Sequence, residues 1–470
     1  NDVYEDNILR TGLTWSKGEV HIMPFVMAKE FLKHPAMFSE VPGATYLTAT
    51  TSGKRPAIQA AGVEIPGTGV PPLLVQATHG AIPNATRVAS AGNLVCAETR
   101  RASRTGRAAL SEIRLSFSGF YIANGTGVET SAGNSQSLQA AIEWPGAPTQ
   151  VVQVTFSGAN TGTIPDGAAE YLSDPIYPGQ FGLKEFPANT GFWYRERRTV
   201  TSGQTHTKTQ ASAGAGEATY YSDGLSASQL VATGVMSLPA GGANASCEFG
   251  PSAFLGRAIG TPDIAVYILG DSLLDGTNDS QIGGIGLNNG GYVMRGLYSV
   301  SGRTVPSMKA SCGGTQAQYF SAGFLKRRAF LKYCTHALCN YGTNDAATAS
   351  RTAAQVLADL RVLWGVVQGG DSNIRYMGQI GIIPRTTSAD SFATVANQTP
   401  RTGFENGGAF RVALNDSIQG FVGSEISEYI DIFYNRQRRH SRLGNLSPVA
   451  FTQQFYRQQQ AALMLPLMVS

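Results

Sequence analysis

The chain has 470 residues, a net charge of +4 at pH 7 and only 14% charged residues. Soluble domains usually carry about 25% charged residues, so this composition argues against a cytosolic enzyme. It favours a secreted, periplasmic or particle-associated protein, although no signal peptide is visible in the sequence. The small net charge argues against a nucleic-acid partner. No apolar run approaches the roughly 18 to 20 residues of a membrane span, so no membrane partner is expected.

The first half of the chain is predicted to be rich in β-strands. A chain of this length is expected to form two domains. We assign residues 1–40 to an N-terminal extension and residues 41–258 to a first domain. Apolar and polar positions alternate in segments such as 113–117, 150–156 and 191–197. This alternation predicts an antiparallel sandwich or a jelly-roll-like domain.

Neither the aromatic residues, nor the charged run, nor the cysteines specify a ligand. The aromatic residues of the β-rich domain can stack on sugar rings or fill its core. The charged run 195–198 is expected to be a solvated strand face. The cysteines lack the paired short spacings of a zinc site, so no metal is expected. They are Cys96, Cys247, Cys312, Cys334 and Cys339.

The second half of the chain is predicted to alternate strands with helices. The apolar run 264–269 predicts a buried strand, and further strands are expected at 335–341 and 374–383. Residues 352–368 place apolar side chains at helical spacing. Strands that alternate with helices predict a parallel sheet covered on both faces. We therefore assign residues 259–424 to an α/β domain.

Polar turns that follow these strands carry the candidate catalytic groups. Ser272 lies in a Gly-Asp-Ser-Leu turn directly after the strand 264–269, and Asn344 lies in a Gly-Thr-Asn-Asp turn after the strand 335–341. A serine needs a base to remove its proton, and the oxyanion formed on attack needs hydrogen-bond donors. The candidate donors are the backbone N–H groups of Ser272 and Gly313 and the amide of Asn344. They predict an oxyanion hole at the carboxyl edge of the sheet.

The order of these residues resembles the SGNH (GDSL-type) hydrolase family over about residues 262–420. The family motifs are a Gly-Asp-Ser-Leu serine, a downstream glycine, a Gly-x-Asn-Asp asparagine and a C-terminal Asp-x-x-His. Ser272, Gly313 and Asn344 match the first three. The resemblance implies a flavodoxin-like three-layer α/β/α domain that hydrolyses esters through an acyl-enzyme, without a metal or cofactor. It also implies an acylated carbohydrate, often an acetylated one, or another small ester as the substrate.

Each motif also has a structural interpretation. A Gly-Asp-Ser sequence is a common turn after a strand, and the segment around Gly313 can be an ordinary loop. Asn344 can contribute to the cap of the helix that follows it. The presence of all three motifs in one order favours the catalytic interpretation for Ser272 and Asn344, and less strongly for Gly313.

The chain departs from the family pattern at its histidine. Only His336 and His440 follow Ser272 in the sequence. His336 lies at the start of a predicted strand, about 20 Å from the carboxyl edge at roughly 3.3 Å per residue, so it is expected to be structural. His440 lies near the position of the family histidine, but Gln437 stands where an aspartate is expected. Two arginines beside His440 disfavour its protonated form.

The C-terminal segment resembles a different family. Residues 425–460 are similar to the C-terminal end of integrase-like (DDE-type) insertion-sequence transposases, on Tyr-Asn-Arg-Gln-Arg-Arg-His-Ser and Leu-Gly-Asn-Leu-Ser-Pro within 434–448. The catalytic acids of such enzymes would lie upstream, so no transposition chemistry is inferred. Our hypothesis is that an insertion element replaced the end of an esterase gene and left a tail, 425–470, without the Asp-x-x-His motif. The alternative is a divergent native end in which His440 is the base.

Three functions therefore remain open at this stage. The first is a serine esterase that acts on carbohydrate O-acetyl groups, with Ser272 as nucleophile and His440 as the candidate base. The second is a catalytically inactive esterase-like protein that binds a glycan or another partner. The third is a DNA-binding fusion derived from a transposase, which the low net charge argues against.

Overall fold

The computed structural model describes residues 71–426 with short gaps, and five short strands before them. The gaps are 91–94, 212, 225–226, 246–248, 278–290, 299–303, 321–323, 392, 395, 406 and 423. The chain divides into two compact units, Asn1–Val70 and Pro71–Ser470. The boundary predicted near residue 258 thus falls inside the second unit.

The first unit contains two small antiparallel groups of strands. The strands are β1 (Val20–Ile22), β2 (Phe38–Glu40), β3 (Leu47–Ala49), β4 (Gly53–Arg55) and β5 (Ala57–Ala60). β5 pairs with both β1 and β2, and β3 pairs with β4. The residues predicted to form an N-terminal extension therefore include two strands of this unit.

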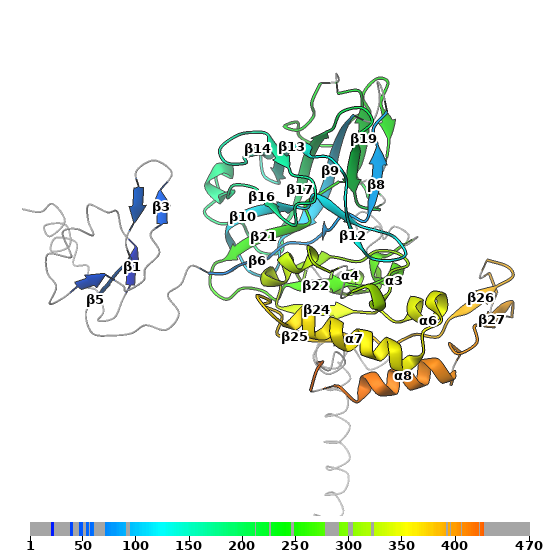
Figure 1. Ribbon diagram of the computed structural model, residues 1–470. Coiled ribbons are helices and arrows are strands. Elements are labelled where there is room, and N and C mark those ends of the chain that lie inside the picture. The colour runs from blue at the N-terminus through cyan, green and yellow to red at the C-terminus, as the bar shows by residue number, and fades with distance from the viewer. Residues whose placement is uncertain are drawn as a thin grey trace, which may run out of the picture. The chain divides into compact units, whose positions relative to one another are not determined.

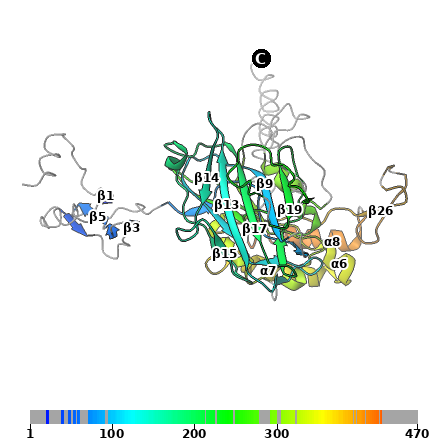
Figure 2. The ribbon, with the colours of Figure 1, turned by 90° about the horizontal axis from the view of Figure 1, so that it is seen from above.

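The second unit begins with two antiparallel sheets. The smaller sheet has the order β16 (Tyr171–Leu172), β10 (Leu110–Phe117), β21 (Ala253–Ala258) and β6 (Leu73–Val75). The larger sheet has the order β14 (Gln150–Val154), β13 (Gln136–Trp144), β17 (Gly191–Thr199), β9 (Cys96–Arg104), β19 (Ala218–Ser222) and β20 (Ala243–Asn244), and β15 (Gly162–Ile164) pairs with β13. The long strands of the larger sheet lie side by side in Figure 2. Two further antiparallel pairs accompany the sheets: β8 (Ala85–Val88) with β18 (Thr205–Lys208), and β11 (Phe120–Ile122) with β12 (Glu129–Ser131).

One apolar core joins these two sheets. Leu115 and Phe254 of the smaller sheet pack in the same cluster as Ile142, Phe192 and Tyr194 of the larger sheet. These side chains are at most 2% exposed. Phe192 and Tyr194 are therefore core residues and cannot serve as surface platforms for sugar rings.

The charged run 195–198 is buried, and the prediction of a solvated strand face was wrong. Arg195, Glu196 and Arg198 are at most 2% exposed. Arg195 pairs with Glu143 of β13 at 2.9 Å, and Arg198 pairs with Glu196 at 2.6 Å. Buried charges persist only where they are paired, and the partner on β13 lies far from this run in the sequence.

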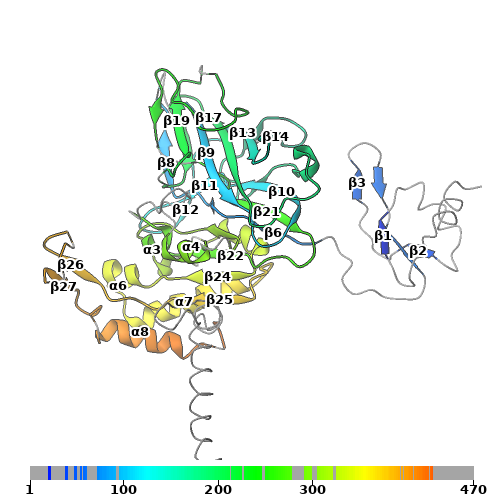
Figure 3. The same cartoon turned by 180° about the vertical axis from the view of Figure 1, so that it is seen from behind.

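A parallel sheet forms the second half of this unit. Its order is β25 (Tyr376–Gln379), β24 (His336–Cys339), β22 (Val266–Leu269), β23 (Ser307–Lys309) and β7 (Gly80–Ala81), and every pair is parallel. β22, β24 and β25 lie within the three segments that the sequence predicted as strands. β7 comes from the β-rich half of the sequence, so the two halves share one sheet. Strands β22, β24 and β25 of this sheet are labelled in Figure 3.

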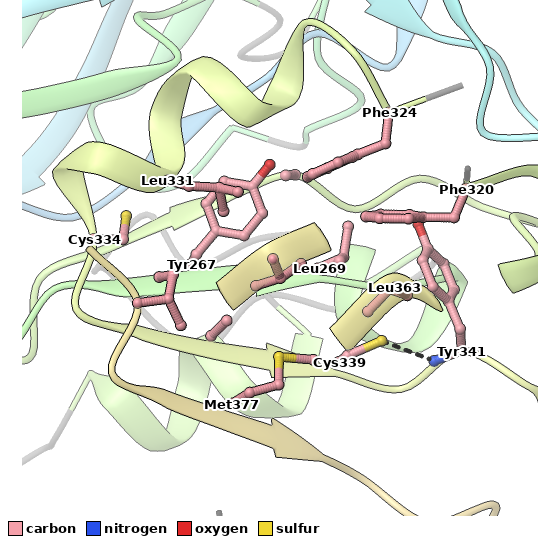
Figure 4. Packing of buried hydrophobic residues seen from close by; sticks show 14 of the residues in the cluster. Tyr267, Leu269, Phe320, Phe324, Leu331, Cys334, Cys339, Tyr341, Leu363 and Met377 are labelled. Carbon is pink, nitrogen blue, oxygen red and sulfur yellow. Dashed lines mark hydrogen bonds between the residues drawn. The ribbon is translucent and has the colours of Figure 1, made fainter. Parts of the chain in front are cut away.

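Helices lie on both faces of the parallel sheet because the side chains of its central strand alternate. Tyr267 and Leu269 belong to one apolar cluster with Leu360 and Leu363 of α7 (Ala353–Gln368). Figure 4 shows Leu363 packed among residues of this cluster. Val266 and Ile268 belong to a second cluster with residues of α4 (Gly291–Leu297). Such a pattern requires apolar residues on both faces of the strand, as the run 264–269 supplies.

The remaining helices and strands complete the second unit (Figure 1). They are α3 (Ser272–Asp275), α6 (Thr343–Ala349), α8 (Ala409–Gln419), the 3₁₀ helices η1 (Pro178–Phe181), η2 (Ala317–Tyr319) and η3 (Arg327–Tyr333), and the hairpin of β26 (Thr386–Ser388) and β27 (Gln398–Pro400). α7 begins at a capping box in which Thr352 and Gln355 bond each other's backbone N–H groups. The described chain is thus a mixed, sheet-rich fold with a few helices. None of its described helices is long and apolar enough to cross a membrane.

Candidate active site

Ser272 lies directly beyond the carboxyl end of the central strand β22. It is the first residue of the short helix α3, and its side chain is half-buried. The backbone N–H of a first helical residue has no acceptor within the helix. Asp271 caps the helix by accepting a hydrogen bond from the Leu273 N–H at 2.9 Å. The turn therefore presents both a hydroxyl and a backbone donor at the edge of the sheet.

The glycine of this turn cannot carry a side chain. A Cβ at Gly270 would lie 2.1 Å from Asn340 Oδ1 and 2.8 Å from Leu274 Cδ1. Gly270 thus allows the turn to pack closely against the end of β24. This packing gives a physical reason for glycine at the first position of the motif.

Asp271 and Asn340 tie the ends of the two central strands together. The Asn340 amide donates to Asp271 Oδ1 at 2.8 Å, and the Asp271 N–H donates to Asn340 Oδ1 at 3.0 Å. Both residues are buried. Burial raises the pKa of Asp271 to about 6, against the lowering effect of these hydrogen bonds.

A buried ion pair fixes the other end of α3. Lys309 Nζ lies 3.1 Å from Asp275 Oδ1 and donates to the Asp275 carbonyl at 2.8 Å. Asn84, from the β-rich half, donates to Asp275 Oδ1 at 2.9 Å. Thr277 donates to the same carboxylate at 3.1 Å. The nucleophile turn is therefore held by residues from both halves of the unit.

Gly313, the glycine that the family resemblance singled out, lies beside Ser272. A Cβ placed on Gly313 would lie 4.0 Å from Ser272 Cβ. The loop that carries Gly313 follows β23, and the Gly270 carbonyl accepts hydrogen bonds from the Cys312 N–H at 3.0 Å and the Thr315 hydroxyl at 3.1 Å. The two turns therefore form one continuous layer at the carboxyl edge of the sheet.

Asn344 belongs to the same layer and follows strand β24. It is the second residue of α6, after Gly342, whose φ of +128° disfavours any residue with a side chain. The Asn344 amide donates to the Thr315 carbonyl at 3.2 Å. Asp345 accepts from the N–H groups of Ala317 and Gln318 at 3.0 and 3.1 Å, and burial raises its pKa. Asn344 is therefore linked to the Gly313 loop through its own side chain.

The β-rich half contributes a residue to this site that the sequence did not reveal. Asn124, in the loop between β11 and β12, has its Nδ2 atom 3.1 Å from the Cβ position of Gly313. The next residue, Gly125, donates its N–H to the Gly313 carbonyl at 3.0 Å. The Asn-Gly-Thr-Gly sequence of this loop is a turn signal. Nothing in it indicates a partner far along the chain.

The histidines of the described part of the second unit make contacts that do not involve Ser272. His336 pairs with Val266 at the amino end of the sheet, bonds Thr335 Oγ1 at 2.8 Å and stacks on Tyr376. Its pKa is lowered by burial and then by Arg375. This agrees with a structural role for His336. His440 lies outside the described residues, so its prediction as the base is neither supported nor contradicted.

The other two histidines of this part of the chain are buried elsewhere. His79 bonds the Ala102 carbonyl at 2.7 Å, and burial lowers its pKa to about 4. His206 packs against Tyr221 and Phe249. Neither set of contacts belongs to the edge of the sheet where Ser272 lies.

No reactive thiol and no metal site accompanies Ser272 in the described part of the chain. Cys312 is buried next to Gly313, and burial raises its pKa to about 12, so its thiol stays protonated and weakly nucleophilic. Cys96, Cys334 and Cys339 are also free and buried, and Cys247 lies outside the described residues. Where residues are described, no group of three or more His, Cys, Asp or Glu side chains could hold a metal ion.

The comparisons with known proteins found one short matching segment of sequence and several weak structural similarities. No protein-family model matches the chain. A stretch of 33 residues, 7% of the chain, is 70% identical to the insertion element IS600 uncharacterized 31 kDa protein of Shigella sonnei. The match spans only 12% of that protein's length. It shows a shared segment and does not assign an activity to the chain.

Several solved structures resemble the chain weakly. A Bacillus subtilis protein is 14% identical, with a TM-score of 0.25 over 68% of this chain and 65% of that one. A family two carbohydrate esterase from Clostridium thermocellum, in complex with cellohexaose, is 13% identical, with a TM-score of 0.20 over 64% and 74%. One from Cellvibrio japonicus is 11% identical, with a TM-score of 0.20 over 75% and 81%. TM-scores this low carry no inference about the fold or activity of the chain.

Proposed function

We propose that the chain is a serine esterase of the SGNH type, with Ser272 as the nucleophile. One observation carries the proposal: Ser272 begins a helix at the carboxyl end of the central strand, within 4.0 Å of the Cβ position of Gly313. Ligands of open α/β sheets bind at this edge. The strand order, with β22 between β23 and β24, supports the flavodoxin-like arrangement that the sequence motifs imply.

The proposed reaction uses Ser272 and three hydrogen-bond donors. The Ser272 oxygen bonds to the acyl carbon and passes its proton to a solvent water, and the π-electron pair of the carbonyl moves to the carbonyl oxygen. The backbone N–H groups of Ser272 and Gly313 and the amide of Asn344 would stabilise that oxyanion. Collapse of this intermediate breaks the bond between the acyl carbon and the alcohol oxygen, which takes a proton from solvent as it leaves. Water then hydrolyses the remaining acyl-enzyme to a carboxylic acid and free Ser272.

The proposal includes a defect in proton transfer. Three of the four family motifs lie at the carboxyl edge of the sheet, and each described histidine of this unit has other contacts. We infer that the tail has replaced the native Asp-x-x-His motif, so that the enzyme keeps its nucleophile and its donors and loses its base. Without its base, a serine hydrolase retains roughly 10³ to 10⁴-fold catalysis over water from the oxyanion hole and binding. Slow turnover that depends on Ser272 is therefore expected.

The substrate and the location remain parts of the same proposal. The sequence motifs support an acylated carbohydrate, with acetyl as the acyl group transferred to Ser272, or another small ester. The low charged fraction supports a secreted, periplasmic or particle-associated protein. No nucleic-acid or membrane partner is proposed.

A catalytically inactive, glycan-binding or partner-binding protein is the second candidate. The contacts of His79, His206 and His336 favour it, because none of them places a base beside Ser272. In that case Ser272, Gly313 and Asn344 would hold an acylated ligand without cleaving it. Binding of an acetylated oligosaccharide without release of acetate would identify this function.

Hydrolysis of p-nitrophenyl acetate tests the proposal. The parent chain should be slow but clearly faster than Ser272→Ala, and Ser137→Ala, at an exposed position on β13, should match the parent. Equal rates for the parent and Ser272→Ala would contradict esterase activity. His440→Ala distinguishes loss of the native base from a role of His440 as the base. The substitution lowers the rate if His440 is the base, and it leaves the rate unchanged if the native base is lost. After subtraction of the hydrolysis that imidazole itself causes, added imidazole should then accelerate the parent chain and not Ser272→Ala.

A further inference from the structure

The loop between β11 and β12 packs directly on the loop that carries Gly313. The Gly125 N–H donates to the Gly313 carbonyl at 3.0 Å, and a Cβ on Gly314 would lie 3.0 Å from Gly125 Cα. A Cβ on Gly127 would lie 3.1 Å from Thr315 Cγ2. Side chains at these glycines would separate the two loops, so the glycines permit a close backbone approach. The β-rich half therefore forms one wall of the candidate site.

A buried ion pair holds this loop in place. Arg327 and Glu129 are paired at 2.9 Å, with side chains 2% and 3% exposed. Arg327 also donates to the Gly127 carbonyl at 2.7 Å. Both bonds thus hold the C-terminal side of the loop to η3, whose residues Phe330 and Leu331 belong to the same apolar cluster as Tyr267 of the parallel sheet. A side chain that contacts a reacting atom needs a rigid support of this kind.

The side chain of Asn124 lies at the tip of this wall, next to the nucleophile. Asn124 Nδ2 and Ser272 Cβ are 3.1 and 4.0 Å from the same point, the Cβ position of Gly313. Asn124 is exposed, and among the described residues its side chain makes no hydrogen bond. Asn344, by contrast, donates from its amide to the Thr315 carbonyl. Asn124 therefore presents an amide donor whose two N–H groups remain available to a ligand.

We propose that Asn124 donates a hydrogen bond from Nδ2 to the acyl oxygen of the ester bound at Ser272. The inference rests on the proposed esterase function and extends it, because it adds a donor from the β-rich half to those of the α/β half. The bond would strengthen as negative charge develops on the oxygen, so Asn124 would act mainly on the chemical step. The β-rich half would then be part of the catalytic site and not only an accessory domain.

The test measures phosphonylation of Ser272 by a fluorophosphonate, followed by intact mass, together with p-nitrophenyl acetate hydrolysis. Loss of one oxyanion donor typically costs about 10²-fold or more in rate. Asn124→Ala should therefore slow both reactions by about that factor, with little change in KM. Asn124→Asp, which keeps the shape and replaces the donor by an acceptor, should be slower still. Thr126→Ala, an alteration in the same loop, should react at the parental rate.

Each result decides a different claim. If Asn124→Ala and Asn124→Asp both react like the parent while Ser272→Ala does not react, the role of Asn124 is overturned and the esterase proposal stands. If Thr126→Ala is slowed as much as Asn124→Ala, the loop acts only by its shape and the donor role is overturned. If the parent chain is neither phosphonylated at Ser272 nor faster than Ser272→Ala in hydrolysis, the proposed function fails and the role of Asn124 fails with it.

Discussion

Asp271 and Asn340 exchange two hydrogen bonds across neighbouring strands, at 2.8 and 3.0 Å, immediately before the candidate nucleophile. One bond uses the Asp271 side chain and the other its backbone N–H. The pair therefore fixes both the direction of the chain after β22 and the cap of α3. Ser272 has its position because two adjacent parallel strands end in groups that satisfy each other.

Replacing Asn340 by alanine should destabilise the fold and loosen the turn that carries Ser272. The substitution leaves the buried Asp271 carboxylate and N–H without these partners, which is expected to cost about 2 to 3 kcal/mol. Urea unfolding measures the loss. Asn160→Ala, at an exposed position, is the matched control and should change stability little. Equal stability of Asn340→Ala and the parent would show that the exchange of bonds contributes nothing.

Asp271→Asn should stabilise the protein at neutral pH and not in acid. Burial raises the pKa of Asp271 in the folded state to about 6, above its ordinary value of 3.8. The folded state therefore binds more protons between these values, and parental stability falls as pH rises through this window. The neutral amide keeps an acceptor for Leu273 and avoids the buried charge, so its advantage should grow between pH 4 and pH 7 to about 3 kcal/mol.

Urea unfolding of both chains at several pH values measures this advantage. An advantage that is constant with pH would mean that Asp271 titrates normally. The exposed Asp390, whose carboxylate accepts hydrogen bonds from Ser388 and Thr394, provides a contrast because these bonds lower its pKa. Asp390→Asn should therefore show no gain as pH rises between these values.

The sequence predicts the part of the site that depends on local order along the chain. A buried strand with apolar residues on both faces, followed by a glycine and a small polar turn, is enough to place Ser272 at the carboxyl edge of a parallel sheet. The same reasoning places Asn344, because its turn also follows a strand directly. Gly313 follows from the resemblance and is close to Ser272 in the structure.

The sequence does not predict the groups that reach the site from the β-rich half. Asn84 contacts Asp275, and Asn124 lies beside Gly313, yet each pair is separated by about 190 residues in the chain. Contacts of this range depend on how two sheets pack, and no local periodicity encodes them. The two-residue strand β7 was missed for a different reason, because it is too short for a recognisable alternation. The burial of the run 195–198 was missed because its partner Glu143 lies on another strand.

Gly270→Ala should be strongly destabilising, although it adds only one methyl group. The new Cβ would overlap Asn340 Oδ1 at 2.1 Å, and relief requires movement of the pair that positions Ser272. Overpacking of this kind typically costs about 1 to 3 kcal/mol. Gly365→Ala is the matched control, because a Cβ there meets no atom within 4 Å and the residue lies within α7. It should stabilise the protein by about 0.5 to 1 kcal/mol. Similar effects of the two substitutions on urea unfolding would contradict the packing argument.

Arg327→Met should both destabilise the protein and slow the reaction at Ser272. Its removal leaves Glu129 as an uncompensated buried charge, which is expected to cost about 3 to 5 kcal/mol, and releases the Gly127 carbonyl that anchors the Asn124 loop. Adding Glu129→Gln removes that charge and should recover part of the stability, but not the rate, because the anchor at Gly127 stays lost. Arg361→Met is the control: its ion pair with Glu425 is exposed, and loss of an exposed pair changes stability little. Urea unfolding measures the change in stability, and the rate of phosphonylation at Ser272 measures the change in reactivity. A stability loss in Arg327→Met with an unchanged rate would show that the ion pair supports the fold without positioning Asn124.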